Sequence, residues 1–131
     1  MTARTGVVAR WLDWWESGDV AIADEIYADG YERHATDSPA SGLDALKALV
    51  AAYLRAFPDL HFDVEDAVTD GDRIAVRWTA TGTDRGGLMG MPPTDRRISL
   101  AGCDILRVQG EQITESWSFY DRLALLDQVK G

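Results

Sequence analysis

The fold of this chain is decided by a stretch around one turn, DGDRIAVRWTAT (residues 70–81). Asp70-Gly71 is a turn signal typical of a β-hairpin. Beyond it, apolar and polar side chains alternate with a period of two, which is typical of a strand with one buried face. The apolar positions are Ile74, Val76, Trp78 and Ala80. The stretch therefore predicts a hairpin within an antiparallel sheet.

Further strands on both sides of this one complete a meander. The segment before the turn alternates at Phe62, Val64 and Val68, and two more strands are predicted over residues 97–108 and 112–120. Residues 82–95 form a loop rich in Gly, Pro and Met, and a last helical turn or two follows residue 120.

Three helices precede the strands. Apolar residues at helical spacing predict helices over residues 3–17, 19–27 and 41–57, with Asp19 as the N-cap of the second and Ser41 at the start of the third. A break at residues 28–30 and a short extended piece over 31–35 separate the last two helices. This order indicates an α+β fold. We expect one domain over residues 1–131, a cone-shaped curved antiparallel sheet with three N-terminal helices packed on its concave face, open at its mouth to a small molecule.

Composition narrows the classes of function. Of the 131 residues, 46% are apolar and 27% charged, and the formal net charge is −9. Such an acidic chain is poorly suited to nucleic acid or an anionic membrane. No apolar run approaches the ~20 residues of a membrane span, and the N-terminus lacks the apolar stretch of a signal peptide. We therefore expect a cytoplasmic protein without a nucleic-acid or membrane partner.

The last strand carries the first candidate catalytic residue. Trp117, Phe119 and Asp121 alternate, so they share one face of the strand if no bulge intervenes. A carboxylate against two aromatic rings is desolvated, which raises its pKa toward the range of a general acid or base. Asp121 also stands just before the final helix, in the position of an N-cap, and the residues alone leave both interpretations open.

His34 and Asp104 are further candidates. His34 lies in the extended piece before the third helix, and is either a proton-transfer group or a loop histidine that bonds the backbone. Asp104 shares the parity of the apolar residues of its strand. Asp104 is either a partner carboxylate of the site or a structural residue, and we expect it to form an ion pair with Arg77 or Arg107.

Aromatic residues are candidates for the wall of a pocket. Trp15, Tyr53, Trp78 and Trp117 either line a cavity or belong to the core. Together with Phe119 they are the residues to which we assign substrate binding, and the expected partner is a small hydrophobic aromatic ligand.

The sequence lacks motifs for metals, nucleotides and covalent catalysis. Residues 86–90 are rich in glycine but open no helix, so they form no phosphate loop. Cys103 is the only cysteine, and the acidic run over residues 59–72 lacks the spacing of a metal site. We expect neither a metal nor a cofactor.

Spaced motifs run through nearly the whole chain. They are Phe57-Pro58-Asp59-Leu60, GDRIAVRW (71–78), Gly90-Met91-Pro92-Pro93-Thr94, and Gly110-Glu111-Gln112-Ile113 followed by Glu115, Trp117, Asp121 and Gln128. This set resembles the SnoaL-like polyketide cyclase family of the nuclear-transport-factor-2-like superfamily. The chain departs from the family pattern at Asp84, where the family often has His, and at Asp95, where it often has Gly.

The resemblance implies an enzyme that closes a ring by intramolecular aldol condensation on an aromatic polyketide-like substrate, without metal or cofactor. It also implies that Asp121 is the general acid/base, that His34 lines the pocket, and that the chain forms a homodimer through the outer face of the sheet. Hydroxylases, isomerases and epoxide hydrolases occur on related folds. The reaction therefore stays open, as does a non-catalytic binding or dimerisation module.

Overall fold

The computed structural model describes residues 6–36 and 38–130. Within these ranges the helices are α1 (Gly6–Ser17), α2 (Val20–Ile26), α3 (Leu43–Ala56) and α4 (Arg122–Lys130), with a 3-10 turn η1 (Leu88–Gly90). The strands are β1 (Tyr27–Ala35), β2 (Ser38–Ser41), β3 (His61–Asp70), β4 (Arg73–Thr83), β5 (Arg97–Gln109) and β6 (Gln112–Tyr120). Residues 3–5 of the first predicted helix lie outside the described part of the chain. None of the described helices is long and apolar enough to cross a membrane.

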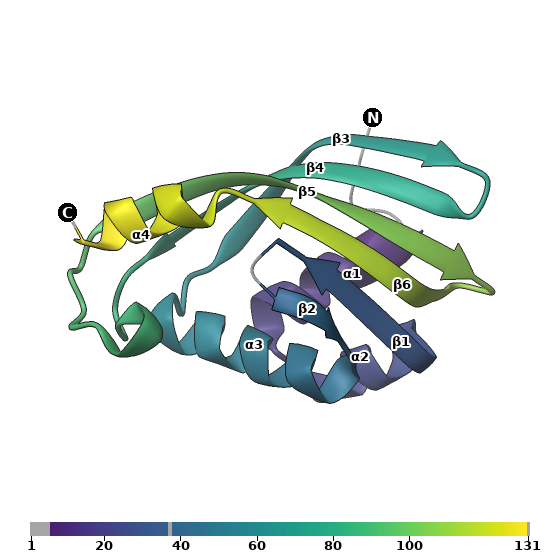
Figure 1. Ribbon diagram of the computed structural model, residues 1–131, viewed down its shortest axis with the longest axis horizontal. Coiled ribbons are helices and arrows are strands. Elements are labelled where there is room, and N and C mark those ends of the chain that lie inside the picture. Colours follow the sequence, from purple (N-terminus) through teal and green to yellow (C-terminus); the bar gives the residue numbers. More distant parts are fainter. Residues whose placement is uncertain (1–5, 37, 131) are drawn as a thin grey trace.

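The strands form one sheet in the order β2-β1-β6-β5-β4-β3 (Figure 1). The strands from β3 to β6 make the predicted antiparallel meander. The sheet as a whole is mixed, because β1, which contains the extended piece predicted over residues 31–35, pairs in parallel with β6. Alternation with a period of two is the same in parallel and antiparallel strands, so it carries no signal of strand direction.

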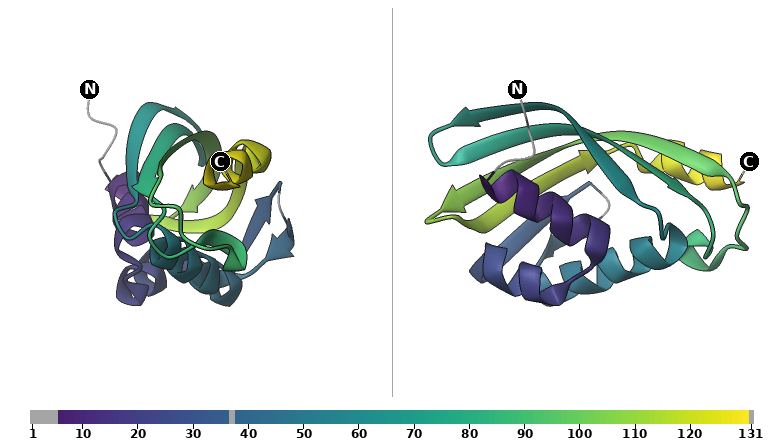
Figure 2. Two further views of the ribbon diagram at one scale, coloured as in Figure 1. Left: turned by 90° about the vertical axis from the view of Figure 1, so that its left-hand side faces the viewer. Right: turned by 180° about the vertical axis from the view of Figure 1, so that it is seen from behind.

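The N-terminal helices α1, α2 and α3 cover the concave face of the curved sheet, as predicted (Figure 2). Buried side chains from both layers make one core, with Trp11, Leu12, Val50, Val76 and Leu106 among them. A second, smaller cluster joins α4 and η1 to the sheet through Leu88, Ile98 and Leu125. The helices and the sheet therefore enclose an apolar interior whose far end is covered by α4 and the loop that carries η1.

Two element boundaries differ from the prediction for local reasons. Ser41 ends β2 instead of starting α3, whose N-cap is Gly42. The predicted break at residues 28–30 is an irregularity inside β1, where Gly30 adopts a φ of 77° and the pairing with β6 shifts register. Asp19 caps α2 as predicted, since its carboxylate accepts a hydrogen bond from a backbone N–H two residues further on.

A β-bulge decides which side chains of β6 face inward. The pairing with β5 shifts register at Thr114, which is an extra residue in β6. Because one inserted residue reverses the alternation, Ile113 shares the buried face with Ser116 and Ser118. The odd-numbered residues after the bulge, with Trp117 among them, lie on the outer face of the sheet.

Candidate active site

A narrow cavity lies between the helices and the concave face of the sheet. About 550 Å³ of empty space lies in the cavity and its mouth, and the centres of water molecules can occupy about 60 Å³ of it. Its wall is mostly aromatic and aliphatic, and includes Trp11, Trp15, Tyr53, Phe62, Trp78 and Leu100. Three residues that the sequence assigns to substrate binding, Trp15, Tyr53 and Trp78, are therefore brought together on this wall.

Among the described residues, Asp104 supplies the only carboxylate on the cavity wall. Asp104 is 5% exposed. Its Oδ1 accepts a hydrogen bond from the indole N–H of Trp78 at 2.9 Å and another from the hydroxyl of Ser118 at 3.1 Å. Both hydrogen bonds use the same oxygen, Oδ1.

The predicted ion pair of Asp104 with Arg77 or Arg107 is wrong. Arg77 Nη2 lies 2.6 Å from an oxygen of Asp66, and Arg107 Nη1 lies 3.0 Å from an oxygen of Glu115. The two arginines occupy odd-numbered positions of β4 and β5, whereas Asp104 occupies an even-numbered one. Alternation therefore places the arginines on the outer face and the aspartate on the inner face.

The environment of Asp104 favours proton exchange near neutral pH. Burial raises the pKa of Asp104 to about 6, although the Trp78 hydrogen bond, the charge of Arg33 and the Ser118 hydrogen bond act in the opposite direction. A carboxyl group with such a pKa can both take up and release a proton under physiological conditions, as a general acid/base must.

Buried polar side chains of β1 and β6 lie close to this carboxylate. The hydroxyl oxygens of Tyr31 and Ser116 are 2.6 Å apart, and Arg33 is 4% exposed. Burial raises the pKa of both Tyr27 and Tyr31, so the two phenols stay neutral. The positive charge of Arg33 acts together with the stronger effect of the Trp78 hydrogen bond to favour the ionised form of Asp104, and the two partly offset the effect of burial.

The position of the Trp78 ring depends on a glycine of the neighbouring strand. Gly102 is the partner of Trp78 in the β4–β5 pairing. A Cβ atom at residue 102 would lie only 2.3 Å from Cζ2 of the indole ring. Because Gly102 has no side chain, the indole ring of Trp78 can lie over β5. Its N–H group then reaches Asp104, two residues further along that strand.

Asp121 lies outside this cavity. Its side chain is exposed, and Oδ1 accepts a hydrogen bond from the backbone N–H of Ala124 at 2.9 Å, which is the N-cap arrangement for α4. The expected burial of Asp121 against Trp117 and Phe119 is wrong, because the bulge at Thr114 turns that side of β6 outward. The capping interpretation of Asp121 is the one that this geometry supports.

His34, Trp117 and Phe119 also lie outside the cavity, contrary to expectation. His34 Nε2 is 2.6 Å from an oxygen of Glu115, and its ring stacks on Trp117 with centroids 5.6 Å apart. Phe119 is 47% exposed. The reason is again the pairing of the strands, because β1 lies beside β6 and places His34 next to the outward-facing Trp117.

Side chains able to bind a metal come together on this outer face. One donor atom each from Glu32, His34 and Glu115 lie within 4.8 Å of one another. His34 and Arg107 already bind the two oxygens of Glu115, at 2.6 and 3.0 Å. The cluster is thus an ion-pair network in its own right, and the absence of a metal requirement stays an expectation.

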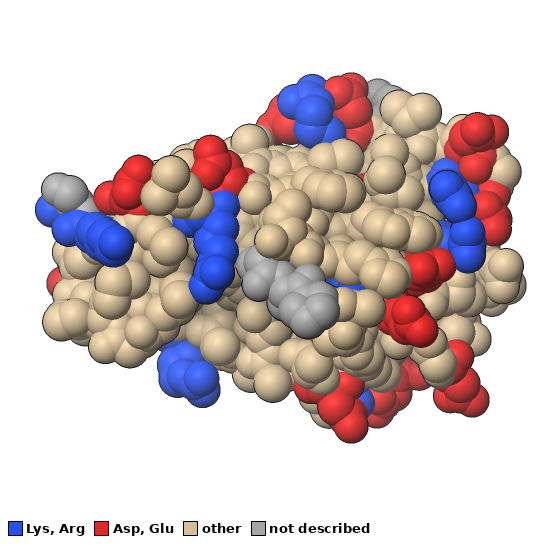
Figure 3. Space-filling model, viewed as in Figure 1, with Lys and Arg blue, Asp and Glu red and all other residues tan. Residues whose placement is uncertain are grey.

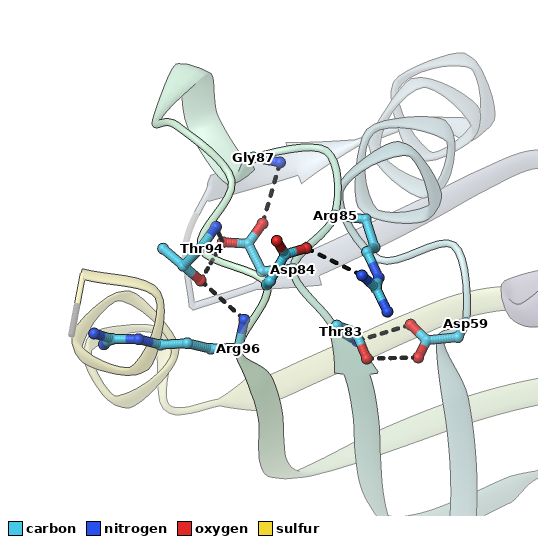
Figure 4. A network of polar contacts seen from close by, with 8 residues as sticks. Asp59, Thr83, Asp84, Arg85, Gly87, Thr94 and Arg96 are labelled. Carbon is cyan, nitrogen blue, oxygen red and sulfur yellow. Dashed lines mark hydrogen bonds and ion pairs between the residues drawn. The ribbon is translucent and has the colours of Figure 1, made fainter.

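The loop between β4 and β5 is held in shape by Asp84. Asp84 is 1% exposed, and its carboxylate accepts hydrogen bonds from the backbone N–H groups of Gly87 and Thr94, both at 3.1 Å (Figure 4). The Thr94 hydroxyl donates a further bond at 2.9 Å. Asp84 therefore shapes this loop, and it is not among the cavity-lining residues.

A wider cleft opens between this loop, α3 and α4. Its volume, measured for the centres of water molecules, is about 430 Å³. Tyr53 and Leu125 line both the cleft and the cavity, so the two spaces adjoin. We call this cleft the vestibule, because it lies beside the cavity at these two residues.

Comparison with protein families agrees with this architecture. The model of the family described as SnoaL-like polyketide cyclase matches residues 5–129. The chain belongs to the SnoaL-like polyketide cyclase family. No curated protein matches it.

Solved structures of SnoaL-like proteins share this fold. IdmH from Streptomyces antibioticus, described as a proposed polyketide cyclase, is 25% identical, with a TM-score of 0.84 over 99% of this chain and 100% of IdmH. AclR from Streptomyces galilaeus, described as a proposed hydroxylase, is 27% identical, with a TM-score of 0.84 over 95% of this chain and 78% of AclR. A SnoaL-like protein from Jannaschia sp. CCS1 is 24% identical, with a TM-score of 0.86 over 95% and 90% of the two chains.

The sequence carries one signal that Asp104 faces the interior. Its parity with apolar residues placed it on the inner face of this SnoaL-like sheet, where a carboxylate meets no arginine of the opposite parity. The hydrogen bonds from Trp78 and Ser118 join three strands, and a single sequence does not show which residues of different strands stand opposite one another.

Proposed function

We propose that this SnoaL-like protein is a cofactor-free enzyme that closes a ring in an aromatic, polyketide-like substrate by intramolecular aldol chemistry, with Asp104 as its general acid/base. The observation that carries the proposal is the buried Asp104 carboxylate on the wall of an aromatic cavity, with Oδ1 held by Trp78 and Ser118. The two hydrogen bonds fix Oδ1 and thereby orient Oδ2 toward a substrate. The carboxylate is therefore already in position before a substrate binds.

The chemistry needs a single carboxylate. Asp104 Oδ2 removes a proton from a carbon next to a carbonyl group, and the electron pair left behind forms an enolate. The enolate carbon attacks a second carbonyl carbon of the same molecule, which forms the new C–C bond and an alkoxide. The proton held by Asp104 then passes to the alkoxide and regenerates the carboxylate.

The cavity wall supports this reaction in two ways. Trp15, Tyr53 and Trp78 offer flat apolar surfaces to an aromatic substrate and exclude water from the enolate. The hydroxyl groups of Tyr53 and Tyr120 also belong to the wall, with their oxygens 3.0 Å apart; one donates to the other, and the proton of the accepting hydroxyl is the one that donates to the enolate oxygen.

A second candidate function is binding without catalysis. The observation in its favour is the narrowness of the cavity, where water centres occupy only about 60 Å³. Ligand sites for drug-sized molecules commonly measure ~300–1,000 Å³. Catalysis therefore requires the substrate to widen the cavity or to extend into the vestibule, whereas a small apolar ligand would fit without either.

We further propose that two copies of the chain pair through the outer face of the sheet. Ile105, Trp117 and Phe119 lie on this face, and Phe119 and Val68 are 47% and 64% exposed. Much of the surface over β5 and β6 carries no charged side chain (Figure 3). An exposed apolar surface of this kind is typical of a protein–protein contact.

Proton exchange tests the proposed base without knowledge of the substrate. In deuterated buffer, NMR measures how fast β-tetralone, a flat aromatic ketone, loses the protons next to its carbonyl group. We expect the wild-type protein to accelerate this loss, and Asp104→Asn to reduce the acceleration by roughly 10²–10⁴-fold. Asp66→Asn, at an exposed carboxylate of β3, is the matched control. Equal rates for the wild-type protein and Asp104→Asn would contradict the proposal.

A further inference from the structure

The vestibule differs in charge from the rest of this acidic chain. Its lining includes Arg55 from the end of α3 and Arg122 from the start of α4, and none of its described lining residues is acidic. The chain as a whole has 22 acidic and 13 basic residues. The described wall of the cleft therefore carries positive charge, whereas the chain as a whole carries negative charge.

The two vestibule arginines are also not used by the fold. No carboxylate oxygen of the described residues lies within 4.0 Å of either guanidinium group, whereas most other arginines of the surface have such a partner. Nη2 of Arg122 lies 3.6 Å from the sulfur of Met89, across the cleft.

The shape of the vestibule keeps these arginines beside the cavity. The loop on its far side is tied to α3, because the backbone N–H groups of Arg85 and Gly86 both donate to the carbonyl oxygen of Ala56, at 2.9 and 3.1 Å. A Cβ atom at Gly86 would lie 2.0 Å from the carbonyl oxygen of Arg55, so the two segments are in direct contact. Arg85 itself points away and pairs with Asp95 at 3.1 Å (Figure 4).

We infer that the vestibule binds an anionic group of the substrate, so that the substrate class is an aromatic acid: its apolar ring system enters the cavity and its carboxylate stays between Arg55 and Arg122. This inference rests on the proposed function, because it takes the adjoining cavity to be the reaction site. Guanidinium groups bind carboxylates and phosphates through paired N–H donors, so both anions are candidates for the same position. Among the residues that the structure describes, the wall of the cavity includes Asp104 and no cation, so the reacting end of the molecule is the uncharged one.

Binding of three matched probes tests the inference. Isothermal titration calorimetry compares 2-naphthoate, 2-naphthyl phosphate and methyl 2-naphthoate, which share one ring system and differ in charge. We expect 2-naphthoate to bind at least about threefold more tightly than its ester, and this preference to disappear in high salt, because exposed charges are screened. Tighter binding of the phosphate than of the carboxylate would assign the vestibule to phosphate esters and would overturn the inference that it binds a carboxylate.

Variants locate the effect. Arg55→Gln and Arg122→Gln should each weaken the binding of 2-naphthoate about three- to tenfold and leave the binding of the ester unchanged. Arg85→Gln, in the loop that borders the vestibule but paired with Asp95, is the matched control and should change neither. Equal affinity for acid and ester in the wild-type protein, or no binding of the acid, would overturn the inference. The β-tetralone exchange assay uses an uncharged ketone, so its failure would contradict the proposed function independently of this result.

Discussion

Trp78 and Asp104 belong to neighbouring strands, and the indole N–H of the first donates to Oδ1 of the second at 2.9 Å inside the cavity. A tryptophan that lines an apolar wall thus also fixes the one carboxylate of that wall. The hydrogen bond stabilises the ionised form of Asp104, whereas burial of the same group stabilises the protonated form. The balance of the two effects determines the pH at which the group changes its charge.

Stability should depend on pH through Asp104. Burial raises its pKa in the folded protein from an ordinary 3.8 to about 6. The folded state thus binds this proton more tightly than the unfolded state, and the resulting stabilisation is full below pH 3.8 and is lost as the pH rises to 6. Asp104→Asn removes this loss, so its free energy of unfolding relative to wild type should increase by up to about 3 kcal/mol between pH 3.5 and 7. Urea unfolding at both pH values measures the difference.

The exposed Asp66→Asn variant provides the reference for that experiment. Asp66 pairs with Arg77 on the outer face, where solvent screens the charge. We expect its relative stability to change by less than about 1 kcal/mol over the same range. An equally flat response of Asp104→Asn would show that Asp104 titrates like an ordinary surface carboxylate.

Removal of the indole donor should move the pH dependence of activity. Trp78→Phe keeps the aromatic wall but deletes the hydrogen bond that favours the charged form, so the pKa of Asp104 should rise further. The limb of the β-tetralone exchange profile that reports deprotonation of the base should shift to higher pH. Trp15→Phe, on the same wall but without a hydrogen bond to Asp104, should leave the profile in place. Identical shifts in both variants would contradict a specific role of the Trp78 N–H.

Asp121 should matter for stability more than for the reaction. Asp121→Ala deletes the N-cap of α4 and should lower the free energy of unfolding by ~0.5–2 kcal/mol, whereas Asp121→Asn keeps an N-cap and should stay close to wild type. Thermal unfolding measures both, and β-tetralone exchange should be unchanged in Asp121→Asn. A large loss of exchange with unchanged stability in that variant would restore Asp121 as the acid/base.

The outer face of the sheet should hold two copies together. Light scattering at working concentration should return about twice 14.4 kDa. Phe119→Asp places a charge in the centre of the apolar surface and should give a monomer, because burying an unpaired charge is costly. Val20→Asp, at a 52% exposed position of α2, is the control and should remain a dimer. A wild-type mass of one chain across a dilution series would contradict the pairing.

The sequence was sufficient for the meander and the helices because each of those elements carries its own period. It was insufficient for the site because two features, an inserted residue and a long-range strand pairing, do not follow from the local period of the side chains. Thr114 inserts one residue into β6 and exchanges its faces, which moves Trp117 and Asp121 away from the interior. The parallel pairing of β1 with β6, which places His34 on the outer face, depends on contacts between segments about 80 residues apart, and local patterns do not encode such contacts.

The way in which Asp84 organises the loop has a practical consequence for protein engineering. Its bonds to Gly87 and Thr94 close the loop on itself, while Thr83 and Arg97 remain paired as the last rung of the β4–β5 ladder. A graft that keeps Asp84, Gly87 and Thr94, together with Leu88 of the second core cluster, would therefore keep the loop closed between these fixed ends. Grafting loops of other lengths and charges onto this rung would change what the entrance admits while leaving the chemistry of the interior intact.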